Sequence, residues 1–140
     1  MIYNVTYKDK DIQESIDELV GKPYSFMSRL RMGGIGSKRL MIRAVSPNFS
    51  RILFSVSDIH YGSIELRPKG IIVHTTRRLD RFSWPIPYYK LVIYNHKFFT
   101  VHADGGYIQF LKNKLYVENK SFIDKVMQLK SDYELEHSFR

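Results

Sequence analysis

The sequence predicts a β-rich α+β domain in which short antiparallel strands are followed by one C-terminal amphipathic helix. Aromatic residues make up 14% of the chain, a content that favours strands. Short apolar stretches separated by turn residues recur between residues 61 and 117. An apolar stripe with helical spacing then follows at 120–135. A chain of 140 residues is long enough for one well-filled core.

The N-terminal segment, residues 1–23, is predicted to form a strand followed by a helix. Apolar and polar residues alternate over 2–8, which indicates a short strand. Apolar residues spaced four and three apart indicate a helix over 9–20. Asp11, with a glutamate three residues later, resembles a capping box, and Gly21 is positioned to end the helix.

No periodicity predominates over residues 24–37, so no element is predicted there, and its glycine-rich part is expected to form a mobile loop. The basic segment 77–81 is likewise expected to be a loop. Tight turns are predicted at Pro68-Lys69-Gly70 and at Asp104-Gly105-Gly106. Alternation predicts strands over 40–44, 52–56, 64–67, 71–74, 89–93, 99–103, 108–110 and 115–117.

The last predicted element is a helix over 120–135. Asn119 or Ser121 is suited to cap its N-terminus. Its apolar stripe, which would pack on the strands, consists of Phe122, Val126, Leu129 and Tyr133.

This order of elements resembles that of bacterial pleckstrin-homology-like (PH-like or GRAM-like) domains over residues 61–133. The segments that carry the resemblance are Ile64–Val73, Trp84–Tyr89, Phe98–Gly106 and the helix from Phe122. The resemblance implies a bent antiparallel β-barrel, or near-orthogonal sheets, closed by the C-terminal helix. The length of the chain favours a single domain over 1–140, in which the barrel and closing helix are expected at 38–135 and the strand-helix of 1–23 is an extension outside this pattern.

The charge of the chain is strongly positive and unevenly distributed. Lysine and arginine total 22 against 14 acidic residues, a net charge of +8. Residues 21–57 contain seven basic residues and no acidic one. A field of this sign attracts anionic lipid, nucleic acid or an acidic protein surface.

The candidate contact residues are cations near turns, together with the one tryptophan. Two of them follow the glycine-rich segment and three lie at or next to a turn beside an aromatic residue. They are Lys38, Arg39, Arg77, Arg78, Arg81 and Trp84. An indole flanked by cations is suited to a membrane surface or to stacking on bases.

The sequence indicates no catalytic or metal site. Its five histidines lack the spacing of metal ligands, and no nucleophile motif or apolar carboxylate pair is present. The absence of cysteine removes thiolate chemistry as well. We therefore expect no enzyme activity, no cofactor and no metal.

The leading hypothesis is a noncatalytic PH-like binding module for a protein partner or an anionic membrane surface. The protein is expected in the cytoplasm, with peripheral membrane association and self-association through the N-terminal segment left open. The second hypothesis, and the main alternative, is nucleic-acid binding through Arg29, Arg31, Arg39, Arg43, Arg77, Arg78 and Arg81. The third hypothesis is a cavity for a small ligand or substrate lined by Tyr88, Tyr89, Phe98 and Tyr107.

Overall fold

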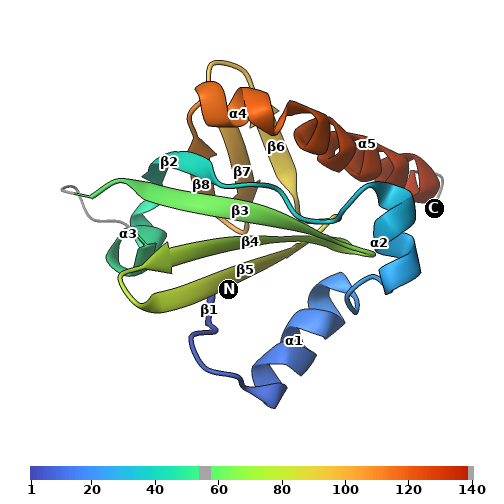
Figure 1. Cartoon of the computed structure of the whole chain (residues 1–140), viewed down its shortest axis with the longest axis horizontal. Helices are drawn as coiled ribbons and strands as arrows, with labels where there is room; N and C mark the ends of the chain where they lie inside the picture. The colour runs from blue at the N-terminus through green and yellow to red at the C-terminus, as the bar shows by residue number, and fades with distance from the viewer. Residues whose placement is uncertain (54–57, 139–140) are drawn as a thin grey trace.

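The computed structural model describes residues 1–53 and 58–138. Within these residues the strands form one antiparallel sheet in the order β1-β5-β4-β3-β2-β8-β7-β6 (Figure 1). The strands are β1 (Tyr3–Asn4), β2 (Leu40–Val45), β3 (His60–Arg67), β4 (Gly70–Arg77), β5 (Asp80–Pro87), β6 (Val92–Asn95), β7 (Phe99–Ala103) and β8 (Gly106–Phe110). The helices are α1 (Lys10–Val20), α2 (Phe26–Met32), α3 (Pro47–Leu53), α4 (Lys114–Glu118) and α5 (Lys120–His137).

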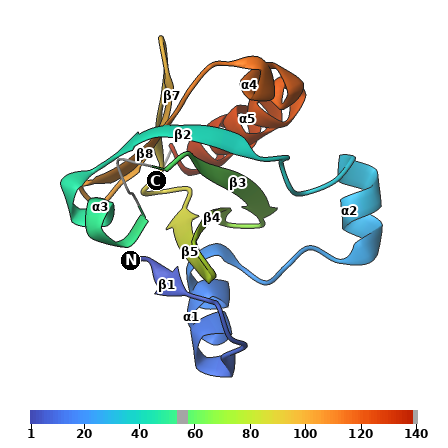
Figure 2. The ribbon, with the colours of Figure 1, turned by 60° about the vertical axis from the view of Figure 1, so that its left-hand side comes forward.

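Strand β2 joins the two halves of the sheet. Its first half, Leu40–Ile42, pairs with β3, and its second half pairs with β8 after a register shift between Ile42 and Ala44. An irregularity of this kind bends a strand and increases its twist. The sheet therefore folds around one core, to which β3 and β4 contribute Ile64 and Val73 while β7 and β8 contribute Val101 and Phe110 (Figure 2).

The predicted class, an antiparallel sheet with a C-terminal helix, is confirmed. The helix α5 packs on the core through Ile123 and Val126, which are fully buried, and the predicted stripe residues Phe122 and Leu129 lie at the edge of this contact. The sheet is not a closed barrel, because β1 and β6 are its two edges and do not pair with each other.

Helix α1 covers part of the opposite face of the sheet. Ile16 and Val20 pack on Ile72 of β4 in a second, smaller apolar cluster. Its N-cap is Asp9, whose carboxylate accepts the N–H groups of Asp11 and Ile12, rather than the capping box predicted from Asp11. Gly21 ends the helix as predicted.

Two predicted strands are wrong where the structure describes their residues. Residues 47–53 form α3, in which Pro47 takes a first-turn position and Phe49 and Leu53, four residues apart, face the core. The rest of that predicted strand, 54–56, lies outside the described residues. Residues 114–118 form α4, because the side chain of Asn113 accepts two N–H groups of the first turn.

The segment expected to be a loop at 77–81 belongs instead to a hairpin. Arg77 ends β4 and Asp80 begins β5, so the turn contains only Arg78 and Leu79. No strand was predicted at β5 because the segment contains two prolines, which lack the backbone N–H group that a paired strand donates. They are tolerated because β1 pairs only with Phe82 and Ser83 and leaves the following part of β5 at the sheet edge. Among the described helices, none is long and apolar enough to cross a bilayer.

Candidate functional site

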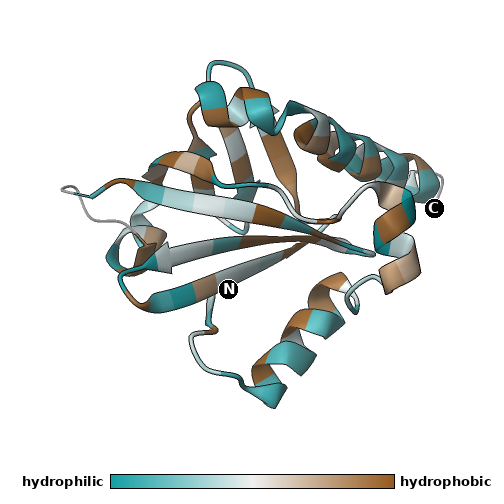
Figure 3. Ribbon diagram, in the orientation of Figure 1, coloured by the Kyte–Doolittle hydropathy of each residue, from teal (hydrophilic) through white to brown (hydrophobic). Residues whose placement is uncertain are grey.

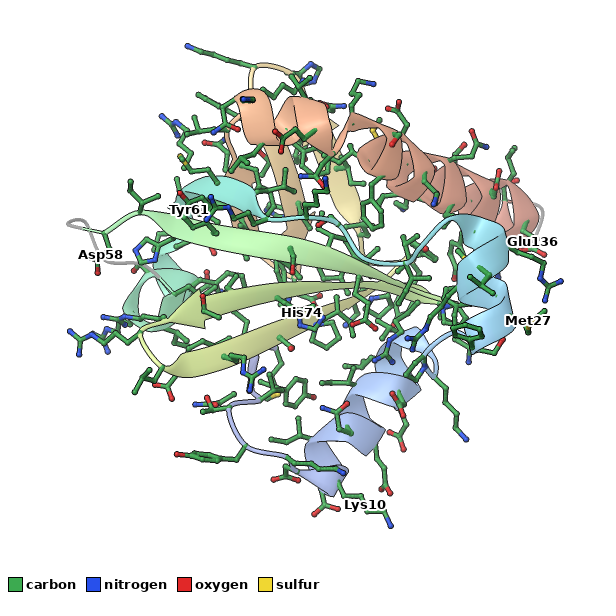
Figure 4. All side chains as sticks on the ribbon, viewed as in Figure 1. Lys10, Met27, Asp58, Tyr61, His74 and Glu136 are labelled. Carbon is green, nitrogen blue, oxygen red and sulfur yellow. The ribbon has the colours of Figure 1, made fainter. Side chains whose placement is uncertain are left out.

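The polar residues of β3, β4 and β5 face away from the main core, on the side that α1 covers in part. The antiparallel register places Ser63 opposite His74 and His74 opposite Ser83, so the three strands present these side chains in one row. Because side chains alternate between the two faces of a strand, Glu65 shares the face of Ser63. Figure 4 labels His74 at the centre of this outer face.

His74 connects two neighbouring strands by hydrogen bonds. Its Nε2 lies 2.9 Å from Oε1 of Glu65, and its Nδ1 lies 2.8 Å from Oγ of Ser83. An ionised carboxylate can only accept a hydrogen bond. In the neutral ring the proton therefore lies on Nε2, which donates to Glu65, while Nδ1 accepts from the Ser83 hydroxyl.

Arg67 holds Glu65 from the other side. Its Nε lies 2.5 Å from Oε2 of Glu65, and its Nη1 lies 2.9 Å from Oδ1 of Asp17 in α1. Burial alone would raise the pKa of Glu65, but the hydrogen bonds from His74 and Arg67 and the Arg67 charge outweigh it and hold the pKa below the ordinary value. Glu65 is therefore ionised and neutralised within the sheet.

A groove of about 590 Å³ opens over this row, between α1 and the outer face of the sheet. Arg39, which precedes β2, lies at one side with its guanidinium carbon 4.3 Å from the ring centroid of Tyr61. Arg81 of β5 also lines the groove. Among the described residues neither guanidinium has a carboxylate partner.

The groove carries a positive charge. Of the described residues that line it, Glu65 is the one carboxylate, and Arg67 and His74 already engage both of its oxygens. The charges of Arg39 and Arg81 are left without local compensation. The hydroxyls of Tyr61, Ser63 and Thr76 line the same groove and add hydrogen-bond donors.

The Ser83–His74–Glu65 chain has the connectivity of a serine-nucleophile relay, but its surroundings do not suit that chemistry. Ser83 is only 2% exposed and lies in a strand paired on both sides, with β1 and β4. Its neighbouring backbone N–H groups are thus taken up by the sheet instead of being free to stabilise an oxyanion. The chain orients His74 and Glu65 at the floor of the groove.

The structure separates the six predicted contact residues. Arg39 and Arg81 both line the groove, whereas Arg77 and Arg78 line a second hollow at the tip of the β4–β5 hairpin. Lys38 is exposed outside both, and its backbone N–H binds Asn119 Oδ1.

The prediction for Trp84 is corrected by its burial. Trp84 is 3% exposed and packs edge-on against Phe49 with ring centroids 4.8 Å apart. Alternation along β5 directs Trp84 into the core while its neighbour Ser83 faces the other side. Trp84 is therefore removed from the candidate contact residues.

The sequence reasoning missed Glu65, His74 and Ser83. For Glu65 the sequence signal is the alternation of Ser63, Glu65 and Arg67 with apolar residues in one strand, and this alternation indicated only an exposed face. The described residues contain no group of three histidine, aspartate or glutamate side chains that could hold a metal ion. Comparisons with protein-family models, with curated proteins and with solved structures found no match to this chain.

Proposed function

We propose that this protein is a noncatalytic binding module that holds an anionic side chain of a protein partner in the outer groove. One observation carries the proposal: Arg39 and Arg81 flank a groove whose one described carboxylate is already neutralised. Guanidinium groups bind carboxylates and phosphates in a bidentate manner, and two of them lining one groove favour an anionic ligand with more than one acceptor oxygen.

The arrangement of strands supports placing the module among PH-like domains. Strand β2 pairs with both β3 and β8, so the first long strand links two groups of strands around one core. The long helix α5 follows the last strand and covers the core with Ile123 and Val126. Of these features, the helix that follows the last strand and covers the core is the one that the resemblance in the sequence implies.

The shape of the groove favours a side chain over a flat surface as its occupant. Its floor is the sheet, and α1 contributes Gln13 and Ile16 to one wall. A planar membrane cannot reach such a floor, whereas a glutamate or phosphoserine side chain can enter from above and meet the donors that line it. The cations at the rim would attract such a partner before it docks.

The test is a titration of the protein, followed by amide chemical shifts, with three capped tripeptides that carry a central glutamate, phosphoserine or glutamine. We expect shifts at β3–β5 with the two anionic peptides and none with the glutamine peptide. Arg39→Gln and Arg81→Gln should each weaken binding by about tenfold, the loss of one charge-assisted hydrogen-bonding group.

Arg43→Gln is the matched control. Arg43 is an exposed arginine of β2 that binds Gln109 and lies over the Phe98 ring, away from the groove. It removes the same charge, so equal weakening by all three substitutions would mean a diffuse electrostatic attraction without a site. Shifts confined to residues that do not line the groove, or equal shifts with the glutamine peptide, would contradict the proposal.

A further inference from the structure

Helix α2 exposes its apolar side chains to solvent. Phe26 is 72% exposed, and Met27 and Leu30 are each 62% exposed. No residue of α2 is buried. Figure 2 shows α2 standing apart from the sheet, and Figure 3 shows its hydrophobic residues in brown at the periphery.

This exposure is not the result of a loosely attached segment. Ser25 caps α2 through the N–H of Ser28, and Gly33 ends it in the left-handed conformation. Lys125 of α5 donates to the backbone carbonyl of Met32, and Tyr24 and Met32 pack against the core on either side of the exposed residues. Both ends of α2 are thus anchored while its middle faces outward.

Basic residues accompany the apolar ones. Arg29 and Arg31 belong to α2 and are exposed, and Arg31 has no hydrogen bond or ion pair among the described residues. The sequence from 21 to 57 contains no acidic residue. We name Phe26, Met27, Leu30 and Arg31 the α2 surface.

We infer that the α2 surface docks on a membrane that contains anionic lipid. A short convex helix with large apolar side chains beside cations matches the boundary between lipid headgroups and acyl chains, where apolar groups insert and arginine meets phosphate. No α2 residue lines the groove over β3–β5, the hollow at the β4–β5 hairpin or the hollow between β6 and α5, whereas a partner's helix would need a concave groove. The inference is separate from the proposed role of the outer groove, because no α2 residue lines it.

The experiment is co-sedimentation of the full chain with vesicles of phosphatidylcholine alone and of phosphatidylcholine with one quarter phosphatidylserine, at physiological salt. We expect sedimentation with the anionic vesicles only. The double substitution Phe26→Ser and Leu30→Ser should lower the partition coefficient by about tenfold or more, because two inserting side chains are lost. Arg31→Gln should lower it by about fivefold.

The opposite end of the molecule supplies matched controls. Leu79, at the tip of the β4–β5 hairpin, is 92% exposed beside Arg78, and Figure 4 places Asp58, near that end, far from Met27. Leu79→Ser and Arg78→Gln make the same kinds of change at that tip and should leave sedimentation unchanged. Arg39→Gln, which tests the groove, should also leave it unchanged.

Three outcomes would overturn the inference. They are no sedimentation of the wild-type protein with anionic vesicles, an undiminished sedimentation of the Phe26→Ser, Leu30→Ser variant, and an equal loss in the Leu79→Ser variant. The first would point to an acidic protein surface as the target of α2. The near-ultraviolet circular dichroism of each variant, compared with that of the wild type, shows that the fold is kept.

Discussion

Arg67 and Asp17, fifty residues apart in the chain, form an ion pair that ties α1 to the sheet. Nη1 of Arg67 lies 2.9 Å from Oδ1 of Asp17 and also donates to the carbonyl of Gly21 at 2.8 Å. The Arg67 side chain is buried, and its Nε binds Glu65. One guanidinium thus fixes the end of α1, the carboxylate at the groove floor and, through that carboxylate, His74.

The first prediction concerns this guanidinium. We expect Arg67→Met to lower the free energy of unfolding by about 3 kcal/mol, because two partly buried carboxylates lose their shared counter-ion. Urea denaturation measures the loss, followed by the fluorescence of Trp84, the one tryptophan of the chain and a core residue. Amide exchange near Gly21 should accelerate because the carbonyl of Gly21 loses its donor.

The control for Arg67→Met is Lys120→Met, which removes the ion pair of Lys120 and Asp124 on the surface of α5. Exposed pairs contribute little, so the stability should not change measurably. A comparable loss in the two variants would contradict the special role assigned to Arg67.

The second prediction concerns acid stability. The pKa of Glu65 is lower in the folded protein than in the unfolded chain, so the unfolded chain takes up the proton first as the pH falls. The contribution of Glu65 is therefore complete above the pKa of the unfolded chain and is lost as the pH falls toward the lower pKa of the folded protein. In Glu65→Gln the stability between pH 6 and pH 3 should fall less steeply than in the wild-type protein.

The measurement is a series of urea denaturation curves at pH values across that interval. Glu65→Gln should also be the less stable protein at pH 6, because Arg67 then lacks one partner. Parallel pH profiles for the two proteins would show that the carboxylates responsible for acid denaturation lie elsewhere in the chain.

The third prediction concerns Gly70, which begins β4 after the Pro68-Lys69 turn. A Cβ at Gly70 would collide with the backbone carbonyl of Ile86 in β5 and with the side chain of Val20 in α1. Gly70→Ala should therefore destabilise the protein by about 3 kcal/mol or more. Thermal unfolding of this variant should be compared with that of Gly36→Ala, since nothing lies within 4 Å of a Cβ at Gly36. Equal melting temperatures for the two variants would contradict the close packing.

The elements predicted correctly are those with strong local signals. Gly21 ends α1 because its positive φ suits glycine, and Asp104-Gly105 forms the β7–β8 turn with both residues at positive φ. The stripe of α5 repeats at helical spacing, so its buried face was visible in the sequence. These signals need no knowledge of distant residues.

The elements predicted wrongly depend on tertiary context. The strand predicted over 52–56 rested on β-branched and aromatic residues, whereas Ile52 and Leu53 belong to α3, in which Leu53 and Phe49, four residues apart, both face the core. To predict strand β5, one must know that β1 is only two residues long. Pro85 lacks a backbone N–H and is acceptable only where no neighbouring strand requires a donor at that position.

The candidate site could not be predicted because it depends on strand register. His74 lies nine residues after Glu65 and nine residues before Ser83 along the chain. They meet only because two tight hairpins bring three strands into line. The basic residues were visible as charge, but charge alone did not distinguish Arg39 and Arg81, which line the groove, from Arg77, which donates to the carbonyl of Arg51.

The two proposed surfaces occupy different parts of the molecule. The groove lies on the outer face of β3–β5, and the α2 surface lies beyond the end of the sheet (Figure 1). A membrane bound by α2 would therefore leave the groove open to a partner. The arrangement is suited to recruiting an acidic protein to a membrane, and the two experiments above test its two halves independently.

The last prediction concerns the packing of α5 on the core. Val126 is completely buried, so an aspartate there places a charge in the core without a partner, at a cost of about 4 kcal/mol, comparable with the whole stability of many small domains. We expect Val126→Asp to be largely unfolded by circular dichroism. Val117→Asp is the matched control, because Val117 in α4 is exposed, and it should keep the wild-type spectrum. A folded Val126→Asp variant would mean that the sheet is stable without the helix on its core.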